Sequence, residues 1–80
     1  MSGELARFFR TLCVVDGRDT ERILRIVGGS RATLRRNLAL ARQLGVVIRY
    51  DRIGRTFHME RSGPFDVQAL RRARFRHAGA

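Results

Sequence analysis

The sequence predicts an α+β fold in which three helices are followed by a two-stranded hairpin and one further helix. Three observations support this prediction. Apolar residues recur at intervals of three and four over about 4–14 and 31–44, which is the spacing of one helical face. Glycines at 17, 28, 29 and 45 separate the helical segments. Over 46–60, apolar and polar residues alternate on both sides of a glycine-containing turn, which is typical of a hairpin.

The first helix is predicted over about 4–14 and ends before Gly17, a residue that suits a helix C-terminus. Its apolar stripe consists of Leu5, Phe8, Phe9 and Leu12. The chain's one cysteine, Cys13, has no second cysteine with which to form an internal disulfide. Because it lies in an apolar run, we expect it to be a small core residue in a reducing compartment.

A short second helix is predicted to begin at Asp19 or Thr20, since either side chain can cap a helix N-terminus. Four apolar residues would bury most of it, namely Ile23, Leu24, Ile26 and Val27. Gly28 and Gly29 end this helix.

The third helix is predicted over about 31–44, with Ser30 as its N-cap and Gly45 at its end. At ~100° per residue, its residues fall into two arcs. The inner arc contains Thr33, Leu34, Asn37, Leu38, Leu40, Ala41 and Leu44. The outer arc contains Arg31, Ala32, Arg35, Arg36, Ala39, Arg42 and Gln43. The two alanines of the outer arc are small, so the helix backbone can approach a partner closely between the arginines.

The hairpin is predicted from the alternation of Val46, Ile48 and Tyr50 with Val47 and Arg49, and from Phe57 and Met59 on the returning strand. The turn lies within 51–55, and Gly54 is expected to adopt a positive φ there. Three arginines, Arg49, Arg52 and Arg55, lie at or near the tip of the hairpin.

The net charge is +10, and all seventeen basic residues are arginines. A domain this basic attracts polyanions such as DNA, RNA or anionic lipid. No stretch approaches the ~18 apolar residues that span a membrane, and the N-terminus lacks the pattern of a secretion signal. We therefore expect a cytoplasmic protein with no membrane partner. A chain of this length has a thin stability margin, so a partner or dimerisation can contribute to its stability.

From Ser30 onward, the sequence resembles the winged helix-turn-helix domains of the DeoR-like group of bacterial transcriptional regulators. The matching positions in the third helix and its exit are Ser30, Thr33, Leu34, Arg36, Leu38, Leu44, Gly45 and Val46. The match continues through Ile48, Tyr50, Asp51, Arg52 and Gly54, so that the resemblance covers roughly 20–60. The order of helix, helix, glycine turn, helix and hairpin is also that of this family.

The sequence departs from the family pattern at three positions. Asn37 stands where aspartate is usual, Ala41 replaces a larger apolar residue, and Gly29 replaces an apolar residue in the turn. Full-length regulators of this group also carry a ligand-sensing domain, for which 80 residues leave no room. We therefore expect no small-molecule ligand and no cofactor.

The resemblance implies sequence-specific binding to double-stranded DNA, with the third helix (about 30–44) in the major groove and the hairpin (about 46–60) as the wing. Arg31, Arg35 and Arg36 are the candidates for contacts with guanine. Around them, Ser30 and Thr33 would contact phosphate or base, Ala32 would permit close approach, and Arg42 would meet a phosphate. The wing would place Arg49, Arg52 or Arg55 along the backbone or in the minor groove.

Two other functions remain open besides that of a small bacterial or phage transcriptional regulator. One is a winged-helix module that docks on another protein, and the other is an architectural or recombination factor in a nucleoprotein complex. A homodimer and a partner protein are both compatible with the sequence. RNA binding is disfavoured because the strands lack paired exposed aromatics; Tyr50 and Phe57 are expected in the hairpin core.

Neither a catalytic site nor a metal site is expected. His58, His77 and Cys13 do not have the spacing of metal ligands. The sequence also lacks a supported nucleophile and base constellation, and Gly28–Ser30 is a turn between helices rather than a nucleotide-binding loop.

The segment after Ser62-Gly63-Pro64 divides the chain into a domain over 1–62 and a C-terminal basic helix or arm over 63–80. Asp66 can cap a helix over about 66–76. This helix would pack on the first helix, pair with a second copy, or remain a basic arm that orders on DNA. We favour packing on the domain or on a partner, because four apolar residues are too many for a free tail. They are Phe65, Val67, Leu70 and Phe75.

Overall fold

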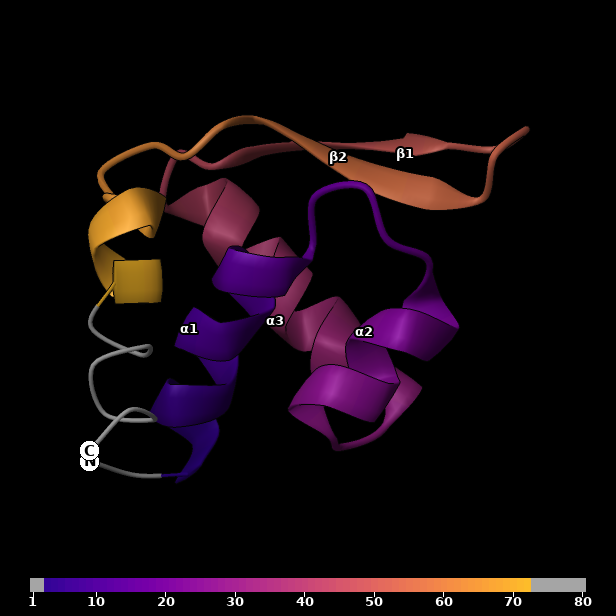
Figure 1. Ribbon diagram of the computed structural model, residues 1–80, viewed down its shortest axis with the longest axis horizontal. Coiled ribbons are helices and arrows are strands. Elements are labelled where there is room, and N and C mark those ends of the chain that lie inside the picture. Colours follow the sequence, from indigo (N-terminus) through magenta and orange to yellow (C-terminus); the bar gives the residue numbers. More distant parts are fainter. Residues whose placement is uncertain (1–2, 73–80) are drawn as a thin grey trace.

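The computed structural model describes residues 3–72 and shows the predicted α+β architecture (Figure 1). Three helices, α1 (Gly3–Val14), α2 (Thr20–Val27) and α3 (Arg31–Gln43), precede an antiparallel hairpin of β1 (Val47–Asp51) and β2 (Thr56–Arg61). Residues 67–72 are again helical. The hairpin lies along one side of the three helices, and its tip extends beyond them. This is a winged-helix-like arrangement. No helix of the described part is long and apolar enough to cross a membrane.

The core lies where α1, α2 and α3 meet beneath the base of the hairpin. Leu12, Val15 and Ile23 are almost completely buried at its centre. α3 contributes Leu34, Leu38 and Ala41, and the hairpin side contributes Val46 and Ile48. Cys13 is buried, as the sequence predicted.

Several residues predicted to be inside are exposed. Ile26 of α2 is 40% exposed, and Leu40 and Leu44 at the end of α3 are 43% and 46% exposed. Leu5 of α1 is similarly exposed, and so is Tyr50 of β1, which was expected in the hairpin core. In α3 the buried residues are Leu34, Leu38 and Ala41, which follow an i, i+4, i+7 line, so the buried stripe is narrower than the predicted arc.

A side-chain cap begins α2, and two glycines form the turn between α2 and α3. Asp19, and not Thr20, caps α2: its Oδ1 accepts a hydrogen bond of 2.8 Å from the Arg22 amide. Gly28 and Gly29 both have positive φ, at 82° and 84°, which glycine adopts without strain. A Cβ on Gly29 would lie 3.3 Å from Arg7 Cδ, so glycine at this position also leaves space for the Arg7 side chain.

The hairpin is hydrogen-bonded to the loop between α1 and α2. The amide of Gly17 donates to the Phe57 carbonyl at 2.7 Å, and the Phe57 amide donates to the Arg18 carbonyl at 2.9 Å. Asp16 Oδ1 also accepts from the Met59 amide at 3.0 Å. These bonds fix the position of β2 relative to the helices.

The turn at the tip of the hairpin differs from the prediction for Gly54. The residue with positive φ is Arg55, at 57°, whereas Gly54 is not in that region. Gly54 instead leaves space for a neighbouring side chain: a Cβ there would lie 2.9 Å from Asp51 Oδ2 and would displace that carboxylate. Asp51 Oδ1 in turn accepts a hydrogen bond of 3.0 Å from the Ile53 amide.

The segment after the hairpin packs on α1, as favoured from the sequence. Phe65 makes edge contacts with the rings of Phe8 and Phe9, with centroids 5.9 and 6.0 Å apart. Arg71 donates two hydrogen bonds to the Cys13 carbonyl, 3.0 Å from Nε and 2.8 Å from Nη2. The predicted cap is present too, since Asp66 Oδ1 accepts from the Ala69 amide at 2.9 Å. Phe75 and the remainder of the predicted helix lie outside the described residues.

Candidate nucleic-acid interface

The outer face of α3 presents exposed arginines around small side chains. Arg35 and Arg36 are exposed on this face, and together with Ala32 and Ala39 they line a shallow hollow. Within residues 3–72, Arg35 makes no hydrogen bond or ion pair with another side chain. The hollow therefore has small alanine side chains at its base and arginine side chains around it, as predicted from the outer arc of the third helix.

Arg31, at the first turn of α3, is paired with an acidic residue that sequence reasoning overlooked. Its Nη2 forms an ion pair with Glu21 Oε1 of α2. Both side chains are largely exposed, and an exposed pair contributes only about 0–1 kcal/mol. A phosphate or a guanine can compete for this arginine.

The polar residues at the start of α3 form a short chain of hydrogen bonds. Ser30 Oγ accepts a bond of 3.1 Å from the Thr33 amide and lies 3.1 Å from Thr33 Oγ1. Arg36 Nη2 donates to the same Thr33 hydroxyl at 3.3 Å. Ser30 is thus occupied as the helix cap, and Thr33 is half-buried and orients Arg36.

We expect Ser30→Ala to lower the free energy of unfolding by about 1 kcal/mol, because the Thr33 amide loses its cap. The matched control is Ser30→Gly, which we expect to cost only a few tenths of a kcal/mol. Urea denaturation followed by circular dichroism measures both. Equal stability of Ser30→Ala and the unmodified protein would show that this cap contributes nothing.

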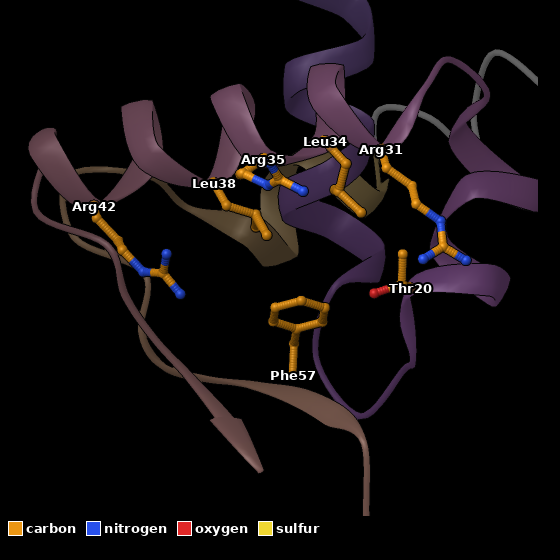
Figure 2. Close-up of a pocket in the computed structure, with 7 residues that line it drawn as sticks. All are labelled: Thr20, Arg31, Leu34, Arg35, Leu38, Arg42 and Phe57. Atoms are coloured by element: carbon orange, nitrogen blue, oxygen red, sulfur yellow. The ribbon is translucent and has the colours of Figure 1, made fainter. Parts of the chain in front are cut away.

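A pocket of ≈ 230 Å³ lies between α3, the start of α2 and the hairpin (Figure 2). Arg31 and Arg42 lie at its two ends, and Phe57 faces α3 from β2. Leu34, Leu38, Arg35 and Thr20 complete the lining. The pocket therefore has an apolar floor, three guanidinium groups and one hydroxyl.

Arg42 links α3 to the hairpin. Its Nη2 and Nε donate to the carbonyl oxygen of Ile48, at 3.2 and 3.4 Å. The sequence placed Arg42 on the outer face as a contact to phosphate, and the structure adds a role in holding β1. Its remaining donors face the pocket.

The hairpin arginines differ in how far they are engaged. Arg49 Nε donates to Glu60 Oε1 on the neighbouring strand at 2.7 Å. Arg52 and Arg55 are exposed at the tip, and within residues 3–72 neither forms a hydrogen bond or an ion pair. Of the three predicted wing residues, these two are the ones available to a partner.

Most of the carboxylates are engaged in maintaining the fold. Four accept backbone hydrogen bonds in caps or turns, namely Asp16, Asp19, Asp51 and Asp66. Glu21 and Glu60 pair with arginines. Within residues 3–72, Arg35 and Arg36 on α3 and Arg52 and Arg55 at the hairpin tip form no ion pair with any of these carboxylates.

Two pocket residues were not selected from the sequence. Thr20 was considered only as a cap for α2, and Phe57 only as hairpin core. Both come together with the α3 arginines through the bonds between the α1–α2 loop and β2, a tertiary contact that leaves no local signal in the sequence.

Known proteins provide no family for this chain. No family model matches it, and no curated protein or solved structure matches it either. The function proposed below therefore rests on the geometry and charge of α3 and the hairpin.

Proposed function

We propose that this protein binds double-stranded DNA in a sequence-specific manner, with α3 in the major groove and the hairpin as the wing. The observation that supports it best is the placement, on both of these elements, of exposed arginines that form no ion pair within residues 3–72. Arg35 and Arg36 project from α3, and Arg52 and Arg55 project from the tip. A helix-turn-helix domain that recognises a DNA sequence needs cationic and hydrogen-bond donor groups on its third helix and on the elements beside that helix.

The outer face of α3 suits the major groove. An α-helix fits this groove, and arginine is the residue that most often recognises guanine, through two hydrogen bonds to O6 and N7. Arg35 and Arg36 are proposed to make these contacts. Ala32 and Ala39 allow the helix axis to approach the base edges.

The pocket between α3 and the hairpin is proposed to receive a backbone phosphate. Arg31 and Arg42 supply cationic donors from α3, and Thr20 supplies a hydroxyl from the first turn of α2. Phosphates are commonly bound by such mixed sets of arginine, hydroxyl and helix N-terminal groups. A contact here would fix the register of α3 on the duplex.

The proposed biological role is that of a small transcriptional regulator acting in the cytoplasm of a bacterial cell or of a phage-infected host. The resemblance to DeoR-like domains supports this role, and the burial of Cys13, the single cysteine of the sequence, is compatible with a reducing compartment. A homodimer would read a symmetric site, with half-sites about one helical turn or a multiple of it apart.

The test is retention of a random-sequence duplex pool at two salt concentrations, followed by sequencing of the retained DNA. We expect an enriched motif that persists at the higher salt. We also expect log K to fall with log salt, with a slope of about −0.9 per phosphate contacted.

Retention without a motif would contradict sequence specificity. Absence of retention at both salt concentrations would contradict DNA binding as a whole and would favour docking on an acidic partner protein.

A further inference from the structure

Ile53, at the tip of the hairpin, is 97% exposed. It is far more exposed than any other large apolar residue of the described chain, the next being about half as accessible. The tip extends beyond the helices, so Ile53 lies at the end of a projecting element (Figure 1). An isoleucine in this position adds nothing to the core.

The conformation of the tip is well defined. Asp51 accepts from the Ile53 amide, and Gly54 packs closely against the same carboxylate. Below the tip, the rings of Tyr50 and Phe57 contact each other across the strands, with centroids 4.8 Å apart. Since β2 is also bonded to the α1–α2 loop, Ile53 is presented on a fixed support.

The residues around Ile53 indicate the chemistry of its partner. Arg52 and Arg55 flank it, and within residues 3–72 no carboxylate pairs with either. The tip therefore combines one apolar side chain with two free cations. It matches a surface that offers negative charge on both sides of a narrow apolar opening. The minor groove of DNA has this arrangement, because phosphates line its edges and stacked bases form its floor.

We propose that Ile53 inserts between base pairs from the minor groove and bends the duplex, with Arg52 and Arg55 bound to the flanking phosphates. This inference rests on the proposed function, because α3 must first dock the protein on DNA. Apolar side chains inserted from the minor groove partly unstack one base step and kink the helix toward the major groove. The protein would then shape DNA as well as recognise it, which gives it an architectural role.

The test uses a duplex that joins the DNA site selected from the random pool, which docks α3, to flanking TA steps, which are flexible and the easiest to open. A donor and an acceptor dye at its two ends report bending by energy transfer, and 2-aminopurine beside one TA step reports unstacking. Anisotropy of the same duplex measures binding. The variants are Ile53→Ser, which removes the apolar side chain, and Ile53→Met, the matched control that keeps one.

We expect the unmodified protein to raise both energy transfer and 2-aminopurine fluorescence, and we expect Ile53→Met to do the same. We expect Ile53→Ser to bind about tenfold more weakly and to lose both signals, because one buried isoleucine side chain accounts for a change of that order. Because the Ile53 side chain makes almost no contact within the fold, we expect Ile53→Ser to have the same melting temperature as the unmodified protein.

Bending by Ile53→Ser equal to that of the unmodified protein would overturn the insertion, and so would binding of the unmodified protein without bending. In both cases the proposed function would stand. Failure to bind any duplex, together with binding to phosphatidylserine vesicles, would overturn both proposals in favour of an anionic membrane surface.

Discussion

Replacement of both Arg35 and Arg36 with alanine is expected to abolish preference for the selected DNA site while leaving the fold intact. Each bidentate contact with guanine provides about 1–3 kcal/mol of discrimination. Both side chains are exposed, and within residues 3–72 the one side-chain hydrogen bond that either makes is the long bond from Arg36 to Thr33. Fluorescence anisotropy with the selected duplex and with a random duplex measures the loss of binding affinity for each.

Two controls separate base recognition from charge. Arg10→Ala removes an exposed arginine of α1 outside the proposed interface, and we expect it to change affinity little. Arg35→Lys keeps the charge but loses the paired donors, so it should retain binding to random DNA and lose selectivity. An equal loss on both duplexes in the alanine variants would show that these arginines contact phosphate.

Replacement of Leu38 with alanine is expected to lower the free energy of unfolding by about 2–5 kcal/mol. Leu38 is 5% exposed in the middle of α3, so its truncation leaves a cavity beneath the hairpin. A domain of this length has a total stability of about 4–12 kcal/mol. The variant should therefore populate the unfolded state at moderate temperature.

The matched control is Leu40→Ala, on the same helix but with the side chain 43% exposed. In a domain of this size, each kcal/mol lost lowers the melting temperature by about 4–8 °C. Calorimetry should show a large shift for Leu38→Ala and a small one for Leu40→Ala. Similar shifts for the two variants would contradict the placement of α3 in the structure.

The features that the sequence predicted correctly depend on local chemistry. Ser30 caps α3 because a serine hydroxyl can reach the amide three residues on, whatever surrounds it. The glycines that end α2 and α3 adopt positive φ for reasons confined to their own backbone. The order and bounds of the elements follow from such signals, and so does the exposed arginine face of α3.

The features that were missed depend on tertiary packing. The Arg31–Glu21 ion pair spans ten residues across the turn between α2 and α3, and nothing in either segment alone indicates it. Leu40 is exposed because the width of the buried stripe is set by neighbouring elements. Gly54 was given the wrong role because the side chain of Asp51 occupies the space beside it.

The hydrogen bonds that join the two ends of the fold also bear on its synthesis. Those from Met59 to Asp16 and from Arg71 to Cys13 connect residues 43 and 58 positions apart. Contacts between such distant residues form slowly compared with local helical contacts. During translation, α1 leaves the ribosome long before Arg71 can reach the carbonyl of Cys13. We therefore expect the native structure to be completed only after nearly the whole described chain has emerged.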